Sequence, residues 1–156
     1  MAELVGGGKT VLEIGIGTGN LAARLLEKGC AVIGVDQSRE MLLRAKAKLP
    51  DVELLEGNFL ALPLEDGSVD TVATTYALHH LKEEEKRLAV AEMMRVAQPG
   101  GRIVIGDNMF ADAAARELDR ERLLSAGLQR VWDEIENGSG PNSVRLFGGL
   151  KIEVVQ

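Results

Sequence analysis

The sequence contains very little that could cross-link the chain or anchor it. Its 156 residues include one cysteine, one tyrosine, one tryptophan and three phenylalanines. Because a lone cysteine, Cys30, cannot form an internal disulfide, the fold must depend on a core of mainly aliphatic residues. No apolar run comes near the roughly 20 residues that a membrane-spanning helix requires. We therefore expect one domain over residues 1–156, a cytoplasmic location and no membrane partner.

The chain also lacks an excess of basic residues. It has 18 lysines and arginines against 24 aspartates and glutamates, which gives a formal net charge of −6 at pH 7. Proteins that bind nucleic acids usually present a basic surface to the phosphate backbone, so this charge disfavours a nucleic-acid partner. A small molecule is the favoured substrate. The sequence predicts no metal site and does not indicate an oligomeric state.

Short apolar runs alternate with helical patterns along the chain, which is typical of βαβ units around a parallel sheet. The predicted strands are Thr10–Ile14, Ala31–Val35, Val52–Leu55, Val69–Thr75, Arg102–Gly106 and Leu150–Val155. The first predicted helix ends at Gly29. Three more are predicted, from Ser38 to Pro50, from Glu83 to Ala97 and from Asp112 to Leu124.

A glycine-rich segment follows the first predicted strand. Glu13–Asn20 reads EIGIGTGN, and Gly15, Gly17 and Gly19 permit a tight turn into the next helix. The same glycines let a ligand approach the backbone closely. About 20 residues later, Asp36 follows the second predicted strand, where a carboxylate can accept hydrogen bonds from both ribose hydroxyls. Together the two features predict a nucleoside site at the carboxyl ends of the strands.

Two classes of cofactor share this layout. In the dinucleotide fingerprint G-x-G-x-x-G, backbone amides at a helix N-terminus face a pyrophosphate, whereas this sequence has G-x-G-x-G. Glu13 also places a carboxylate beside the loop, where it would repel a pyrophosphate and suit an α-ammonium group. The pattern favours the sulfonium cofactor S-adenosylmethionine and leaves an NAD(P)-dependent oxidoreductase as an alternative.

Five segments follow one another in the order and spacing of a known family. They are Val11–Asn20, Val32–Ser38, Glu56–Pro63, Val69–Leu81 and Pro99–Ile105. These segments resemble the motifs of class I S-adenosylmethionine-dependent methyltransferases, and GTGNL, EGNF and TYALHHL look most like small, poorly characterised bacterial members. The resemblance implies a three-layer, Rossmann-like α/β sandwich. Its mainly parallel sheet would have the order 3-2-1-4-5, with a C-terminal strand added beside strand 5.

The resemblance also implies roles for individual residues. Those expected to bind the cofactor are Glu13, Gly15, Gly17, Gly19, Asp36, Gln37, Asn58, Phe59 and Thr75. Glu13 would face the amino group and Asp36 would hold the ribose hydroxyls, without holding any part of the core together. Asn58 stands where the family usually has aspartate, so its oxygen would accept from the adenine 6-amino group as a weaker, neutral acceptor.

The implied activity is methyl transfer to a small-molecule acceptor by in-line displacement. Because the sulfonium leaving group is already activated, positioning and water exclusion can supply most of the rate, and no general base is obligatory. Tyr76, His79 and His80 follow the fourth predicted strand, and Tyr76 and His79 are weak candidates for acceptor chemistry. Asp107–Phe110 are the expected acceptor-side residues.

Parts of the family pattern are expected to be missing, as in a truncated domain. Family members usually carry helices before the first strand and a terminal hairpin, whereas this chain is expected to end after one terminal strand. Glu136–Gly149 is rich in glycine, serine and asparagine, so we expect a loop with disorder or a chain break near Gly138–Ser143. Met1–Gly8 is too short for a lid, which predicts an exposed cofactor cleft. A non-catalytic cofactor-binding module is the second alternative.

Overall fold

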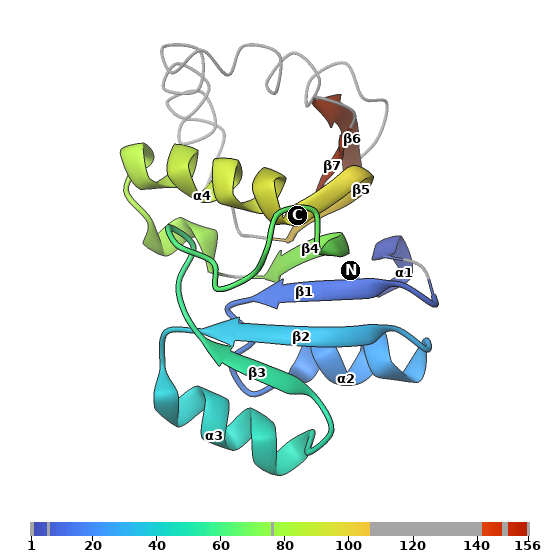
Figure 1. Ribbon diagram of the computed structural model, residues 1–156, viewed down its shortest axis with the longest axis vertical. Coiled ribbons are helices and arrows are strands. Elements are labelled where there is room, and N and C mark those ends of the chain that lie inside the picture. Colours follow the sequence, from blue (N-terminus) through green and yellow to red (C-terminus); the bar gives the residue numbers. More distant parts are fainter. Residues whose placement is uncertain (1, 6, 76, 107–141, 148–149, 156) are drawn as a thin grey trace.

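The computed structural model describes residues 2–5, 7–75, 77–106, 142–147 and 150–155 (Figure 1). Its helices are α1 (Ala2–Val5), α2 (Asn20–Glu27), α3 (Arg39–Lys48), the short 3-10 helix η1 (Leu78–His80) and α4 (Glu83–Val96). Its strands are β1 (Thr10–Ile14), β2 (Ala31–Asp36), β3 (Glu53–Glu56), β4 (Val69–Thr75), β5 (Ala97–Gly106), β6 (Asn142–Phe147) and β7 (Leu150–Val155). The predicted alternation of strands and helices is thus observed through residue 106.

The strands form one sheet in the order β3-β2-β1-β4-β5-β7-β6. Strands β1 to β5 are all parallel, which confirms the predicted α/β fold and the predicted order 3-2-1-4-5. β7 lies beside β5 and runs parallel to it, with Ile103 opposite Ile152, so the C-terminal strand also has its predicted place. β6 pairs antiparallel with β7 at the edge of the sheet.

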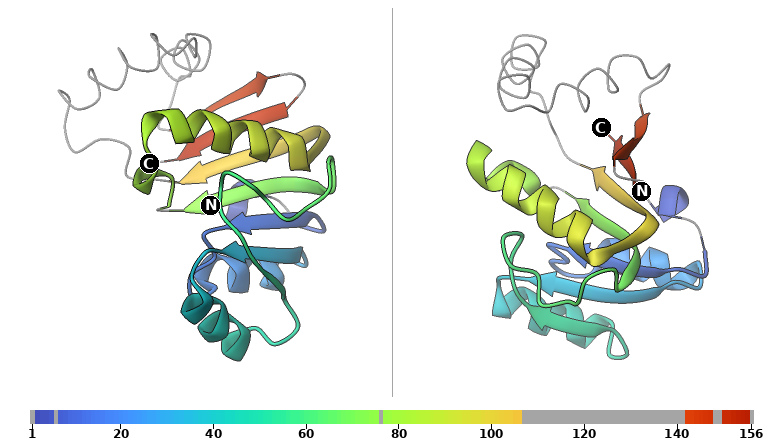
Figure 2. Two further views of the ribbon diagram at one scale, coloured as in Figure 1. Left: turned by 60° about the vertical axis from the view of Figure 1, so that its left-hand side comes forward. Right: turned by 45° about the horizontal axis from the view of Figure 1, so that its top comes forward.

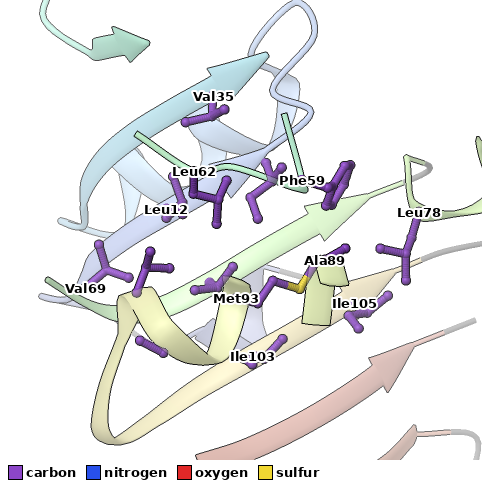
Figure 3. Packing of buried hydrophobic residues seen from close by; sticks show 14 residues of the cluster. Leu12, Val35, Phe59, Leu62, Val69, Leu78, Ala89, Met93, Ile103 and Ile105 are labelled. Carbon is purple, nitrogen blue, oxygen red and sulfur yellow. The ribbon is translucent and has the colours of Figure 1, made fainter. Parts of the chain in front are cut away.

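Helices cover both faces of the sheet, which gives the three layers that the resemblance implies (Figure 2). On one face, α2 and α3 lie over β1 to β3, and Leu25 and Val11 belong to one buried cluster. On the other face, α4 packs on β4 and β5, and Met93 belongs to a second cluster with Leu12 and Ile103 (Figure 3). Val11 of β1 belongs to the first cluster and Leu12 and Ile14 to the second, and the last four residues of β1, which include Glu13, are all buried.

The helix boundaries follow from local sequence. Ser38 caps α3, because its side-chain oxygen accepts a hydrogen bond from the Met41 N–H at 3.4 Å. In α4 the Glu85 side chain reaches back to the N–H of Lys82 at 2.8 Å, as in a capping box. At the end of α2, Gly29 has φ 76°, a conformation that favours glycine.

The fifth strand begins earlier than the sequence predicts. We expected Pro99-Gly100-Gly101 to end the helix and the strand to start at Arg102, but β5 extends back to Ala97, which pairs with Val69. The register shifts before Arg102 pairs with Thr71, so the ladder contains an irregularity of the kind that a bulge produces. The side-chain amide of Gln98 donates to the carboxylate of Asp70, which supports this early pairing.

The prediction of a single terminal strand is wrong. Asn142–Phe147, inside the expected loop, is strand β6, and it forms a terminal hairpin with β7. We predicted disorder or a chain break near Gly138–Ser143. This is wrong for residues 142 and 143, which belong to β6, and residues 138–141 lie outside the described residues. The glycine, serine and asparagine around it masked a short segment, SVRLF, with the β-branched and aromatic residues typical of strands.

The start of the chain also contributes to the fold. Ala2 and Val5 of α1 are buried in the same cluster as Leu25, so this segment covers part of the α2 face of the sheet. The predicted helix Asp112–Leu124 lies outside the described residues. Within the part of the chain that the structure describes, no helix is long and apolar enough to cross a membrane.

The α4 face of the core can be tested by a pair of substitutions on one helix. Met93 is fully buried, whereas Leu88 is 57% exposed. We expect Met93→Ala to lower the free energy of unfolding by about 2–5 kcal/mol, because it leaves a cavity under the helix. Leu88→Ala should change it by less than about 0.5 kcal/mol. Urea unfolding followed by circular dichroism measures both values, and equal losses would show that α4 is not packed as described.

Candidate functional site

The carboxyl ends of four parallel strands bring the predicted site residues to one edge of the sheet. Register pairs Ile14 with both Val35 and Thr74, and Asp36 with Glu56, so the segments that follow these strands start side by side. The predicted residues at this edge are Glu13, Gly15, Gly17, Gly19, Asp36, Gln37, Asn58, Phe59 and Thr75. In open α/β sheets, ligands bind outside this edge.

The three glycines of the loop have different surroundings. All three have positive φ, at 72° for Gly15, 54° for Gly17 and 76° for Gly19. A Cβ at Gly15 would lie 2.8 Å from the Cβ of Ala77, and one at Gly19 would lie 2.7 Å from Leu49 Cδ1. A Cβ at Gly17 would meet no atom within 4 Å. Gly15 is therefore restricted by Ala77, Gly19 lies against the flexible end of the Leu49 side chain, and Gly17 is the position where the backbone faces open space.

Asp36 joins the glycine loop to the end of β2. Its Oδ2 accepts a hydrogen bond from the Gly17 N–H at 2.9 Å, and its Oδ1 accepts one from the Ser38 N–H at 2.8 Å. Asp36 was expected to hold no part of the core together, and its two bonds go to the glycine loop and to the residue that caps α3. Each carboxylate oxygen has two lone pairs, so both oxygens keep acceptor capacity for a ligand.

Glu13 is a buried carboxyl group directly under the loop. Its relative exposure is 1%, and burial raises its pKa from 4.5 to about 8, against smaller lowering effects from the Ala22 N–H and the charge of Lys48. The pKa of Glu13 is higher in the folded protein than the 4.5 of the unfolded chain. Its contribution to the free energy of unfolding is therefore complete below pH 4.5 and is lost as the pH rises through about 8. Oε2 of Glu13 has no hydrogen-bond partner among the described residues.

The cation whose charge acts on this carboxyl group, Lys48, is already engaged elsewhere. Nζ of Lys48 donates to Oδ1 of Asn20 at 2.7 Å and so links the end of α3 to the start of α2. Its charge acts on Glu13, yet it leaves Oε2 of Glu13 without a donor. The site therefore contains a desolvated carboxyl group whose ionised form is favoured only when a further donor or cation approaches.

The residues expected to contact adenine differ in exposure. Gln37 and Asn58 are exposed, and the Asn58 Oδ1 accepts from the Leu60 N–H at 2.8 Å, which fixes the orientation of its amide. Phe59 is only 8% exposed and lies in the α4-side cluster near Leu62 (Figure 3). Asn58 thus presents a polar side chain at the edge, whereas Phe59 anchors the same segment in the core.

The acceptor side of the site is only partly described. Thr75 ends β4 and is half-buried, and the backbone of His79 lies in η1 beside exposed His80. Tyr76 and Asp107–Phe110 lie outside the described residues. Sequence reasoning missed Thr74, whose buried Oγ1 has no partner among the described residues. A threonine in a strand is ordinary, so no pattern in the sequence could have singled it out.

The chain is similar to proteins of one family. A family described as a methyltransferase domain matches residues 11–101. An uncharacterized methyltransferase of Oceanobacillus iheyensis is 39% identical over 126 residues, which cover 81% of this chain and 59% of that protein. An uncharacterized methyltransferase of Bacillus cereus is 42% identical over 128 residues, which cover 81% of this chain and 58% of that protein. The chain thus spans less than two thirds of the length of these relatives.

Solved structures share the same fold. The YcgJ protein of Bacillus subtilis has a TM-score of 0.69 at 24% identity, over 93% of this chain and 67% of that chain. An S-adenosylmethionine-dependent methyltransferase of Mesorhizobium loti has a TM-score of 0.54 at 29% identity, over 65% of this chain and 47% of that chain.

The open position at Gly17 can be tested against a matched glycine. Gly29 also has positive φ, at 76°, and also has no atom within 4 Å of an added Cβ, but it lies at the other end of the sheet. Alanine at either position should destabilise the protein by about 1–2 kcal/mol, because both adopt left-handed backbone. Only Gly17→Ala should weaken binding of S-adenosylhomocysteine, by about tenfold or more, since it fills the ligand approach. Calorimetry measures the affinities, and equal affinities would remove Gly17 from the site.

Proposed function

The chain belongs to the methyltransferase domain family, and on this premise we propose that the protein transfers a methyl group from S-adenosylmethionine to a small-molecule acceptor. The observation that carries the proposal is the buried Glu13 carboxyl group, whose Oε2 has no partner beside the glycine loop. An α-ammonium group is a donor and a cation, so it would supply what Glu13 lacks. The residues present therefore fit the amino-acid end of this cofactor.

The other end of the cofactor fits the remaining residues of the edge. Asp36 keeps acceptor capacity on both oxygens for the two ribose hydroxyls. Gly17 leaves room for the ligand beside the loop. Asn58, with its amide oriented by Leu60, offers its oxygen to the 6-amino group of adenine. Gln37 is the exposed neighbour expected beside the base.

This chain's contribution to the reaction is to bind and orient. When bound, the cofactor supplies a methyl group on a sulfonium that is already activated toward displacement. Asp36 would hold the ribose and Glu13 the amino group, on either side of the sulfonium, and this would orient the methyl group. Tyr76 and His79 stay the candidates for contact with the acceptor. The net charge of −6 favours a small-molecule acceptor over a nucleic acid, and a cytoplasmic location is part of the same proposal.

The oxidoreductase alternative is disfavoured by the spacing of the glycine loop. The sequence has G-x-G-x-G where the dinucleotide fingerprint has G-x-G-x-x-G. The family match points the same way.

A non-catalytic cofactor-binding module is distinguished by activity. The protein is incubated with S-adenosylmethionine that carries a labelled methyl group and with a metabolite extract, and labelled products are separated. The proposal expects a labelled small molecule that is absent when Asp36→Ala replaces the wild type. Cofactor binding without any labelled product would favour the non-catalytic module.

The ionisation of Glu13 gives a direct test of its role. Because its pKa is about 8 in the free protein, Glu13 is mostly protonated at pH 7, and binding an ammonium group must release its proton. We expect S-adenosylhomocysteine to release close to one proton, about 0.9, at pH 7 and almost none above pH 9. Titration calorimetry in two buffers of different ionisation enthalpy measures this number.

Glu13→Gln is the control for that titration. It keeps the shape of the side chain and removes the ionisation, so it should bind more weakly with heats that no longer depend on the buffer. Heats of the wild type that are independent of the buffer would show that Glu13 does not meet the ammonium group. Binding of NAD⁺ but not of S-adenosylhomocysteine would establish the oxidoreductase alternative instead.

A further inference from the structure

The segment between β3 and β4 has almost no regular structure of its own. Residues 57–68 contain one isolated bridge, between Asn58 and Ala61, and no helix or strand. This segment nevertheless carries Asn58, the residue assigned to adenine under the proposed function. A few of its hydrogen bonds are internal, such as those from the Ala61 and Leu64 N–H groups to the carbonyl oxygens of Asn58 and Leu62. Its conformation also depends on contacts with other elements.

One turn of α4 supplies most of these contacts. Nη1 of Arg95 donates to the carbonyl oxygen of Leu64 at 2.8 Å, and its Nη2 donates to the carbonyl oxygen of Leu62 at 3.1 Å. Oε2 of Glu92 accepts from the Leu62 N–H at 2.9 Å. The carbonyl oxygen of Arg95 accepts from the Gly67 N–H at 2.8 Å. Both polar groups of the Leu62 backbone are thus held by the same turn of helix.

Glu92 and Arg95 also hold each other in a fixed geometry. Nε and Nη2 of Arg95 donate to the two carboxylate oxygens of Glu92, each at 2.8 Å, and Nη1 also donates to Asp66. The two side chains are only 21% and 30% exposed, so solvent screens the pair less than an ordinary surface pair. The hydrogen bonds from Arg95 lower the pKa of Glu92 to about 2, and the pair stays ionised at neutral pH.

Apolar packing ties the same segment to the same helix. Phe59 and Leu62 are buried with Ala89 and Met93 of α4, and their side chains enter one apolar layer between helix and sheet (Figure 3). Asn58 lies next to Phe59 and is bridged to Ala61, which precedes Leu62. A shift of Leu62 would therefore be passed to Asn58 through Ala61, the neighbour of Leu62 that is bridged to Asn58.

We propose that the Glu92–Arg95 pair is a positioning element for adenine recognition, acting through Leu62 on Asn58. The inference rests on the proposed function, because it concerns the cofactor assigned there. It assigns to two charged residues on the α4 face a role in cofactor selectivity, although neither is placed in contact with the ligand. Selectivity here means preference for a 6-amino purine over a 6-oxo purine, which presents an acceptor where adenine presents donors.

The test compares two ligands in matched variants. Affinities for S-adenosylhomocysteine and S-inosylhomocysteine are measured by calorimetry for the wild type and for Arg95→Met, which keeps side-chain length but loses every donor. Arg44→Met is the control, because Arg44 lies on α3, outside the proposed contact, and forms an exposed pair with Glu40 at 2.6 Å. Glu92→Gln, a milder change in the same pair, is the second variant if Arg95→Met does not fold.

The expected result is a loss of discrimination. The wild type and Arg44→Met should prefer the adenine ligand by about tenfold, the effect of one hydrogen bond of ordinary strength. The preference should fall to less than about threefold in Arg95→Met and in Glu92→Gln. A merely structural role would weaken both ligands equally and leave their ratio unchanged, and an unchanged ratio in either folded variant would overturn the proposal.

Hydrogen exchange separates this inference from the proposed function. In the ligand-free protein, Arg95→Met should speed amide exchange in residues 57–68 and leave β1 and β2 at the wild-type rate. Unchanged exchange in residues 57–68 would overturn the positioning role whatever the protein binds. A different outcome is that Arg95→Met speeds exchange in residues 57–68 but the wild-type protein binds neither purine ligand. That outcome would contradict the proposed function and with it the selectivity, while the contact between α4 and the segment would stand.

Discussion

The hydrogen bond from the Gly17 N–H to the Asp36 carboxylate connects the two segments on which the site depends. The N–H groups of Gly15 and Ile16 also donate to the carbonyl oxygen of Val35, so the start of the loop is held as well, and the bond to Asp36 fixes its central residue. With it, the loop is fixed over the buried Glu13, and Gly17 faces open space. One carboxylate thus shapes the loop and keeps lone pairs for a ligand. Glu13 below the loop is buried, and its Oε2 has no partner among the described residues, which is unfavourable for the free energy of folding.

The fold and the position of the site could be predicted because both depend on local patterns. Buried parallel strands such as Thr10–Ile14 appear as short apolar runs, and Ser38 is a recognisable helix cap. The glycines and Asp36 fall at strand ends, and a parallel sheet brings strand ends together. These inferences need no knowledge of distant contacts, so the order of the first five strands was correct, and the candidate site residues follow strand ends at one edge of the sheet.

What could not be predicted depends on contacts between distant residues. Gly17 and Gly19 cannot be distinguished in the sequence. In the structure, a Cβ at Gly19 would meet Leu49, whereas a Cβ at Gly17 would meet no atom within 4 Å. The pairing of Glu92 and Arg95 with Leu62 spans about 30 residues and has no periodic signal. Strand β6 was missed because glycine, serine and asparagine surround its short strand-like segment, and its pairing with β7 is not visible in the sequence. Each error arises where tertiary contacts override the local pattern.

A crystal structure of the protein with S-adenosylhomocysteine is the most direct test of the central claim, that the edge formed by Gly17, Asp36 and Glu13 binds the cofactor. The account predicts that both ribose hydroxyls donate to Asp36 while its bond to the Gly17 N–H persists. It also predicts the amino group of the ligand beside Glu13 and the base beside Asn58. A ligand bound at another edge of the sheet, or at this edge with its ribose turned away from Asp36, would contradict it.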